Sequence, residues 1–187
     1  MIYFFLFLST YFRFPVYHSL LEKVNQLNPI WKEQGIQMIH SISKLLELLL
    51  DYRYVMNGEE NRDKRMYCTV NLLNFYKDEI NRKEMYVRYI YKLCDLHLPA
   101  ENYTEAAFTL KLHADLLNWS FNVIPRDSCC PVEQQEWQRK EALYLAIIDY
   151  FDKGKCWEEG IPLIEEMAQF YRTKIFDYQK LSSLLVC

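Results

Sequence analysis

Apolar side chains recur every three or four positions along most of this chain, which is the spacing of one face of an α-helix. The pattern predicts helices over these stretches, in chain order: 15–27, 31–56, 61–80, two helices within 81–119, two within 133–173, and 176–187. No long stretch alternates apolar and polar residues, so no β-sheet is expected. The pattern therefore predicts an all-α protein.

The two helices within 81–119 carry their own start and stop signals. Asn81 and Asn102 each stand three positions before a glutamate, the spacing of a capping box at a helix N-terminus. Pro99 predicts the end of the first helix, because Leu98 before it should be pushed out of the α region. These signals predict a helical hairpin.

Three further features predict how the helices pack. Small residues at Ala106 and Ala114 should let the helices of the hairpin approach closely. Gly154 is expected to cap the helix that precedes it. In the long helix 31–56, the spacing predicts a buried face made of aliphatic residues: Ile39, Ile42, Leu46, Leu49 and Val55, broadened by Leu45, Leu48 and Tyr52.

A shift of 54 residues aligns the second hairpin with the first. It places 103–106 on 157–160 and Ala114 on Ala168. We interpret this as two hairpins of one type, stacked in an antiparallel array like those of tetratricopeptide or armadillo proteins. Chance similarity between two amphipathic hairpins is the alternative interpretation.

Four stretches together carry a family resemblance: LLEKVNQLNPIWKEQGIQMIHSISKLLELLLDYR, RYIYKLCDLHLPAENYTEAAFTLKLHADLLNW, YFDKGKCWEEGI and KIFDYQKLS. In this order they resemble the DOCKER domain of DOCK-family guanine nucleotide exchange factors and the helical segment leading into it. The resemblance extends over about 14–186. It implies that 15–80 is the leading segment and 81–187 the first, helical lobe of the domain, with hairpins over 81–119 and 133–173.

The same resemblance implies a function. The intact protein would activate a Rho-type GTPase, Rac-like, in cytoskeletal signalling, and would be cytoplasmic with recruitment to the plasma membrane. In this family the groups that contact the GTPase belong to the second and third lobes, so no catalytic, cofactor-binding or metal-binding residue is assigned here. The lobe in this chain would brace the next lobe, docked on the C-terminal helix 176–187.

The last helix has the pattern of an incomplete contact surface. Its apolar stripe consists of Tyr178, Leu181, Leu184 and Leu185. We expect Leu184, Leu185 and Val186 to lack partners in this chain and to pack against the lobe that follows.

The first fourteen residues, MIYFFLFLSTYFRF, are unusually apolar. They lack the basic start and cleavage site of a signal peptide and are too short to span a bilayer, so we interpret 1–14 as the edge of a larger protein. Together with the sequons at Asn102 and Asn118, they are the basis of one alternative, a secreted helical protein. A free-standing helical-repeat adaptor with an unrelated peptide partner is the other.

Charge and cysteine content narrow the classes further. The formal charge is −3 without a long run of one sign, which provides no basic surface for nucleic acid. The 6 cysteines do not resemble a small disulfide scaffold, and we expect free thiols in a reducing compartment. A redox or metal pair at Cys129 and Cys130 is the minor alternative to two ordinary loop cysteines.

The sequence contains one weak constellation of reactive side chains. Cys94 and His97 share one predicted helix, and His113 lies on the next. They could form a metal site or a Cys–His nucleophile pair, but metal sites usually need a third or fourth ligand that no pattern supplies. A buried thiol with two hydrogen-bonded histidines is the ordinary interpretation.

Overall fold

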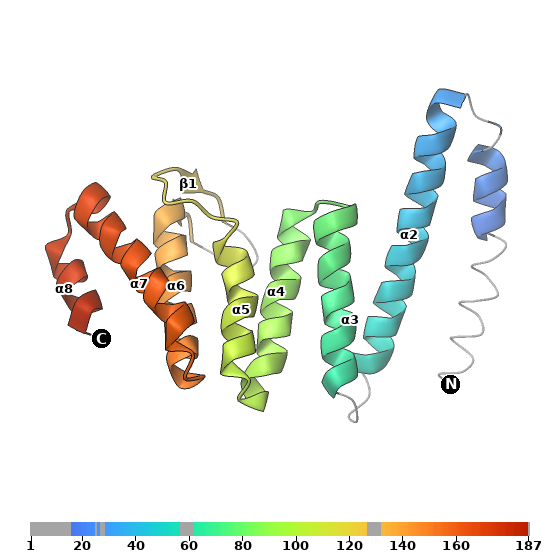
Figure 1. Ribbon diagram of the computed structural model, residues 1–187. Helices are drawn as coiled ribbons and strands as arrows, with labels where there is room; N and C mark the ends of the chain where they lie inside the picture. The colour runs from blue at the N-terminus through green and yellow to red at the C-terminus, as the bar shows by residue number, and fades with distance from the viewer. Residues whose placement is uncertain (1–15, 25, 27–28, 57–61, 127–131, 187) are drawn as a thin grey trace.

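The computed structural model is a single row of antiparallel helices (Figure 1). It describes residues 16–24, 26, 29–56, 62–126 and 132–186, so the apolar leader 1–14 and the Cys129–Cys130 pair lie outside the described residues. After a helix over 16–24 the elements are: α2 (Pro29–Met56), α3 (Arg62–Asn74), a π-helix (Phe75–Glu79), α4 (Lys83–His97), a 3-10 turn (Leu98–Ala100), α5 (Tyr103–Ala114), β1 (Val123–Ile124), β2 (Gln134–Gln135), α6 (Glu136–Lys153), α7 (Trp157–Phe170), a second π-helix (Tyr171–Ile175) and α8 (Tyr178–Val186). The predicted all-α class is confirmed.

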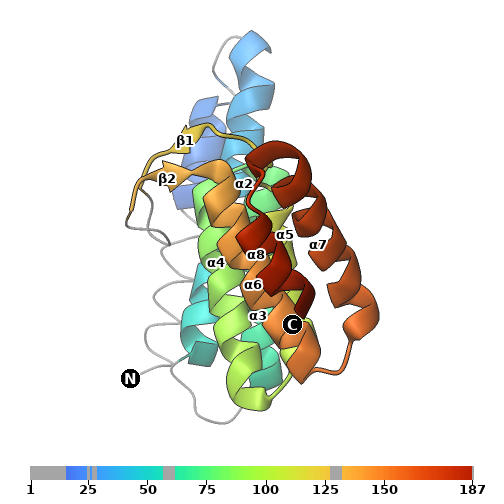
Figure 2. The ribbon, with the colours of Figure 1, turned by 90° about the vertical axis from the view of Figure 1, so that its left-hand side faces the viewer.

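Each helix of the row packs against the next, from α2 to α8. Figure 2 looks along this row from the α8 end, with α8 in front of α6 and α7 to one side. The core runs through the row as one cluster, and α5 contacts both α4 and α6. On α5 the small residues Ala106, Ala107 and Ala114 have no exposed surface, which confirms the predicted close approach at Ala106 and Ala114.

The two hairpins share the same turn geometry. Glu101 and Lys155, 54 positions apart, both adopt the left-handed conformation, with φ of 59° and 57°. The second helix of each hairpin then begins at equivalent positions, Tyr103 and Trp157. Two non-glycine residues at positive φ in matching turns are uncommon, so this geometry supports the interpretation of an internal repeat.

The predicted signals at the first hairpin are wrong in detail. Asn81 does not cap α4; it has a φ of 50°, and the N-cap is Arg82. Asn102 is the N-cap of α5, but its side chain makes no capping hydrogen bond. Leu98 remains helical at φ −58° and ψ −47°, because the chain tightens into a 3-10 turn that ends at Glu101.

The outer helix α2 packs only part of its predicted apolar face against the core. Ile42 and Leu46 are 47% and 48% exposed, so their predicted burial is wrong. The residues that pack on the core cluster are Leu45, Leu48, Leu49 and Tyr52. Among the described core helices, α3 is the neighbour of α2, and it covers the side that carries these four residues. The side that carries Ile42 stays open.

Two short elements depart from the predicted pattern. The stretch after Trp119 contains a two-residue ladder in which Val123 pairs with Gln135, so the expectation of no β-structure is wrong there. Strands of two residues are too short to show alternation. The helix expected over 61–80 changes to a π-helix at Phe75, which the apolar spacing could not reveal.

Trp119 fixes the start of this irregular stretch against α6 and α7. Its indole nitrogen donates a hydrogen bond of 2.6 Å to Glu166, which also accepts one of 2.8 Å from the Tyr144 hydroxyl. The Trp119 ring packs on Phe170 with the ring centroids 4.6 Å apart. Lys140 lies over the same indole and donates to the Leu117 carbonyl at 3.1 Å. The stretch is therefore held on the second hairpin.

Gly154 ends α6, as predicted, but not through left-handed backbone. Its φ is −79°, and the left-handed residue is the next one, Lys155. A Cβ on Gly154 would lie 2.4 Å from Thr104 Oγ1 and 3.0 Å from the Thr104 amide nitrogen at the start of α5. The glycine is needed because two hairpins approach each other here.

We expect Gly154→Ala to lower the free energy of unfolding by about 1–3 kcal/mol, because the added methyl group would press on backbone as well as on a side chain. Gly160→Ala is the matched control. Its Cβ would meet Phe151 at 3.6 Å, an ordinary contact, and alanine favours the helix interior. Urea denaturation of both variants is the measurement, and equal losses would contradict the predicted contact.

Candidate docking groove

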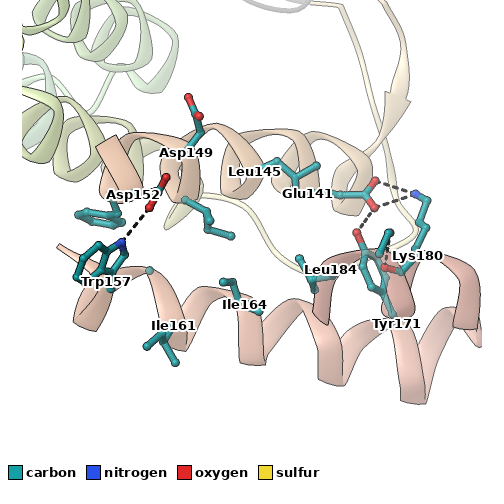
Figure 3. Close-up of a pocket in the computed structure, with 14 residues that line it drawn as sticks. Glu141, Leu145, Asp149, Asp152, Trp157, Ile161, Ile164, Tyr171, Lys180 and Leu184 are labelled. Carbon is teal, nitrogen blue, oxygen red and sulfur yellow. Dashed lines mark hydrogen bonds and ion pairs between the residues drawn. The ribbon is translucent and has the colours of Figure 1, made fainter. Parts of the chain in front are cut away.

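A groove of about 580 Å³ lies between α6, α7 and α8, at the C-terminal end of the row (Figure 3). Its floor contains the buried side chain of Phe151 beside Gly160. The exposed apolar side chains that line it are Leu145, Trp157 and Ile161, which are 50%, 54% and 52% exposed. Three large apolar residues exposed together in a concave site form a candidate docking surface.

Trp157 is held in place although half of it is exposed. Its indole nitrogen donates a hydrogen bond of 2.9 Å to Asp152 Oδ1 at the end of α6. In addition, Lys155 Nζ lies 5.6 Å from the ring centroid, within the range of a cation–π contact. An aromatic side chain fixed in this way loses little conformational freedom when a partner covers it.

A polar cluster closes the opposite end of the groove. Glu141 of α6 accepts a hydrogen bond of 2.8 Å from Lys180 of α8 and another from the Tyr171 hydroxyl. Burial, followed by this bond to Glu141, raises the pKa of Tyr171. Lys180 also lies 5.2 Å from the centroid of the Trp137 ring. These contacts hold α8 on α6, and they fix that end of the groove.

Helix α8 begins two residues later than predicted. Phe176 is left-handed, with a φ of 59°, and 63% exposed. Asp177 then caps α8, because its side chain accepts hydrogen bonds from the backbone amides of Gln179 and Lys180 at 3.1 Å and 3.0 Å. This local cap sets which face of α8 meets the row.

The apolar stripe of α8 is only partly unpartnered. Leu181 and Leu184 are 9% and 8% exposed and belong to the core cluster, so the expected lack of a partner for Leu184 is wrong. Leu185 and Val186 are 60% and 84% exposed, as predicted. Leu184 lines the groove, whereas the exposed Leu185 and Val186 do not.

The structure does not support Cys94, His97 and His113 as a reactive site. Burial raises the pKa of the Cys94 thiol to about 11, which keeps it neutral and a poor nucleophile. His113 is buried, and its Nδ1 lies 3.2 Å from the Tyr91 hydroxyl. Burial lowers the pKa of His97. Within the part of the chain that the structure describes, no three His, Cys, Asp or Glu side chains gather in a way that could hold a metal ion.

The expectations about free thiols and membrane-spanning helices can be compared with the described residues only. Cys68, Cys94 and Cys156 are free thiols, which confirms the prediction for these three. Among the described helices, none is both long enough and apolar enough to cross a bilayer.

The groove itself was not predicted from the sequence. Asp152 and Trp157 are five residues apart across a turn, so a pairing between them could have been suggested from the hairpin alignment. Glu141 and Lys180 are 39 positions apart, and no local pattern connects them. The groove exists because α8 folds back onto α6, which only the three-dimensional arrangement reveals (Figure 3).

Comparison with known proteins agrees with this architecture. Residues 66–186 match the family model described as DHR-2, Lobe A. The chain is 56% identical over 169 residues to dedicator of cytokinesis protein 3 of Mus musculus, and 49% identical over 171 residues to dedicator of cytokinesis protein 4 of the same organism. It is 24% identical over 149 residues to DOCK-like protein 1 of Saccharomyces cerevisiae.

These alignments cover 90%, 91% and 79% of this chain but only 8% of each relative. The chain thus corresponds to one short part of much longer proteins. The family model covers well over half of the chain, from within α3 to the end of α8. The chain therefore belongs to the dedicator-of-cytokinesis (DOCK) family and contains lobe A of a DHR-2, or DOCKER, domain.

Proposed function

We propose that this chain is the scaffold lobe of a guanine nucleotide exchange factor for Rho-family GTPases, Rac-like, in cytoskeletal signalling. The exchange factor acts in the cytoplasm and is recruited to the plasma membrane as part of the longer protein. Lobe A braces the lobe that follows it and does not itself contact the nucleotide. The observation that carries this proposal is the apolar groove at the α8 end of the row, together with the match to lobe A.

The exposed groove residues favour a permanent neighbour over bulk water. Burying a side chain such as Leu145, Trp157 or Ile161 contributes about 1.5–3 kcal/mol relative to full exposure. Leu185 and Val186 add exposed apolar surface at the end of α8, although they do not line the groove. A following lobe packed against α6, α7 and α8 would cover all of these side chains at once.

The alternative is a free-standing adaptor that binds an unrelated peptide helix in this groove. Both functions use the same apolar surface, so binding alone does not separate them. Nucleotide exchange does, because only the first function links the groove to a GTPase.

The chain alone should not accelerate release of fluorescent GDP from Rac, because the proposed function assigns insertion at the nucleotide site to the other lobes of the domain. In a longer exchange factor that contains all lobes, Trp157→Ala with Ile161→Ser should slow release about tenfold or more, the effect of losing a central aromatic contact. Phe176→Ala is the matched control, since Phe176 is 63% exposed but does not line the groove. Equal effects of the two variants, or acceleration by the chain alone, would contradict the scaffold function.

Adjacent leucines of α8 should respond in opposite ways. Leu185→Ser should reduce self-association of the isolated chain with little change in the free energy of unfolding, because Leu185 is 60% exposed. Leu184→Ser should cost about 2–5 kcal/mol of stability, because Leu184 is part of the core. Light scattering and urea denaturation measure the two effects, and a large stability loss for Leu185→Ser would mean that this leucine belongs to the core of the chain.

A further inference from the structure

Three tyrosine rings pack together where α2, α3 and α4 stand side by side (Figure 1). Tyr89 of α4 stacks on Tyr76 of the π-helix that follows α3, with the ring centroids 5.4 Å apart. Tyr52 of α2 packs edge to face on Tyr89 at 5.7 Å. Tyr76 and Tyr89 are 6% and 4% exposed, and Tyr52 is half-buried against the core. Packing therefore fixes where the hydroxyl groups of these rings lie.

The three hydroxyl groups lie near one another and reach solvent. Burial raises the pKa of Tyr89 to about 12, with a further contribution from the nearby hydroxyls of Tyr76 and Tyr52. Within the described part of the chain these hydroxyls make no hydrogen bond, yet none of them is a buried atom without a partner, so each is open to water. All three can therefore donate a hydrogen bond to a ligand at neutral pH.

Two cations of α4, Arg88 and Lys92, lie beside the tyrosines. Lys92 Nζ is 4.9 Å from the centroid of the Tyr89 ring and 5.0 Å from that of Tyr52, which holds the ammonium group by cation–π contacts. Burial raises the pKa of Tyr52, Tyr76 and Tyr89, and the positive charge of Arg88 lowers all three. The guanidinium group therefore lies near the hydroxyls.

No carboxylate of the described residues neutralises these two cations. Glu84 and Asp95 share their face of α4, four positions before Arg88 and three after Lys92. Even so, neither cation takes part in a salt bridge among the residues that the structure describes. Burial, followed by the charge of Arg88, lowers the pKa of Lys92. The cluster therefore offers two positive charges and three hydroxyl donors to an anion.

This set of donors suits a phosphoryl group. A phosphorylated side chain carries a charge of about −1.5 to −2 at neutral pH and three acceptor oxygens. Two cations balance that charge, and a guanidinium group can bind two of the oxygens at once. An anionic membrane suits the cluster less well, because Glu84 and Asp95 flank it and the whole chain has a formal charge of −3.

We propose that Arg88 and Lys92, with the hydroxyls of Tyr52, Tyr76 and Tyr89, bind a phosphorylated side chain of a partner protein. The two cations neutralise the phosphoryl group, and the hydroxyls donate hydrogen bonds to its oxygens. This phosphate site lies on α2, α4 and the π-helix between α3 and α4, whereas the groove lies between α6, α7 and α8. The proposal is therefore independent of the scaffold function.

Titration of the full chain with a Gly-Ser peptide that carries one phosphoserine tests the site. Nuclear magnetic resonance of carbon-labelled tyrosine rings should show saturable shifts at Tyr52, Tyr76 and Tyr89, and none with the unphosphorylated peptide. Inorganic phosphate should compete with the phosphopeptide. Equal effects of the two peptides, binding of inorganic phosphate without the phosphopeptide, or binding only to phosphatidylcholine vesicles that contain phosphatidylinositol 4-phosphate would overturn the proposal.

Variants separate the phosphate site from general attraction between charges. Arg88→Gln with Lys92→Gln should weaken phosphopeptide binding at least about tenfold, because both counter-charges are lost. Arg172→Gln with Lys174→Gln removes the same charge from exposed residues at the other end of the row and should change the affinity less than about twofold. Tyr52→Phe keeps the ring and should weaken binding about twofold to tenfold. Equal losses in the two double variants, or no loss in Tyr52→Phe, would contradict the site.

Discussion

Close contact along α5 is the constraint on which the rest of the row depends. This helix packs on α4 on one side and on α6 on the other, so it joins the two hairpins. Ala106, Ala107 and Ala114 are fully buried, and Gly154 brings the end of α6 against Thr104 at the start of α5. Any added volume at these positions would have to push whole helices apart, because the interior is close-packed.

The candidate groove is a consequence of the same contact. Gly154 and the left-handed Lys155 form the tight turn that places Trp157 at the start of α7. From that position the indole reaches Asp152 and stands at the mouth of the groove. The close packing of the hairpins and the exposed aromatic side chain are therefore parts of one arrangement, in which the repeat positions the candidate docking surface.

Local pattern predicted the hairpins because helices of this length are specified by residues three and four apart. The start of α7 at Trp157 was predicted, whereas the left-handed residues Glu101 and Lys155 in the turns were not. Contacts between distant segments were not predictable in this way. Leu184 is buried because Glu141 binds Lys180 and because Asp177 caps α8, neither of which leaves a periodic signal.

Helix α2 also shows what local sequence pattern cannot predict. Spacing alone identified apolar faces on α2, but it could not decide which of them meets α3, so Leu46 was assigned to the core and Leu45 to its margin. Two apolar faces on one helix predict two neighbours. The described residues supply α3 for the first face and the helix over 16–24 for part of the second.

The central claim, that the groove at the α8 end seats a following lobe, is tested most directly by the solvent accessibility of Trp157. Hydroxyl-radical footprinting would compare this chain with a longer exchange factor that contains all lobes. The account predicts that Trp157 is oxidised readily in the isolated chain and is strongly protected in the longer protein, while the exposed Phe176 reacts similarly in both. Equal oxidation of Trp157 in the two proteins would contradict it.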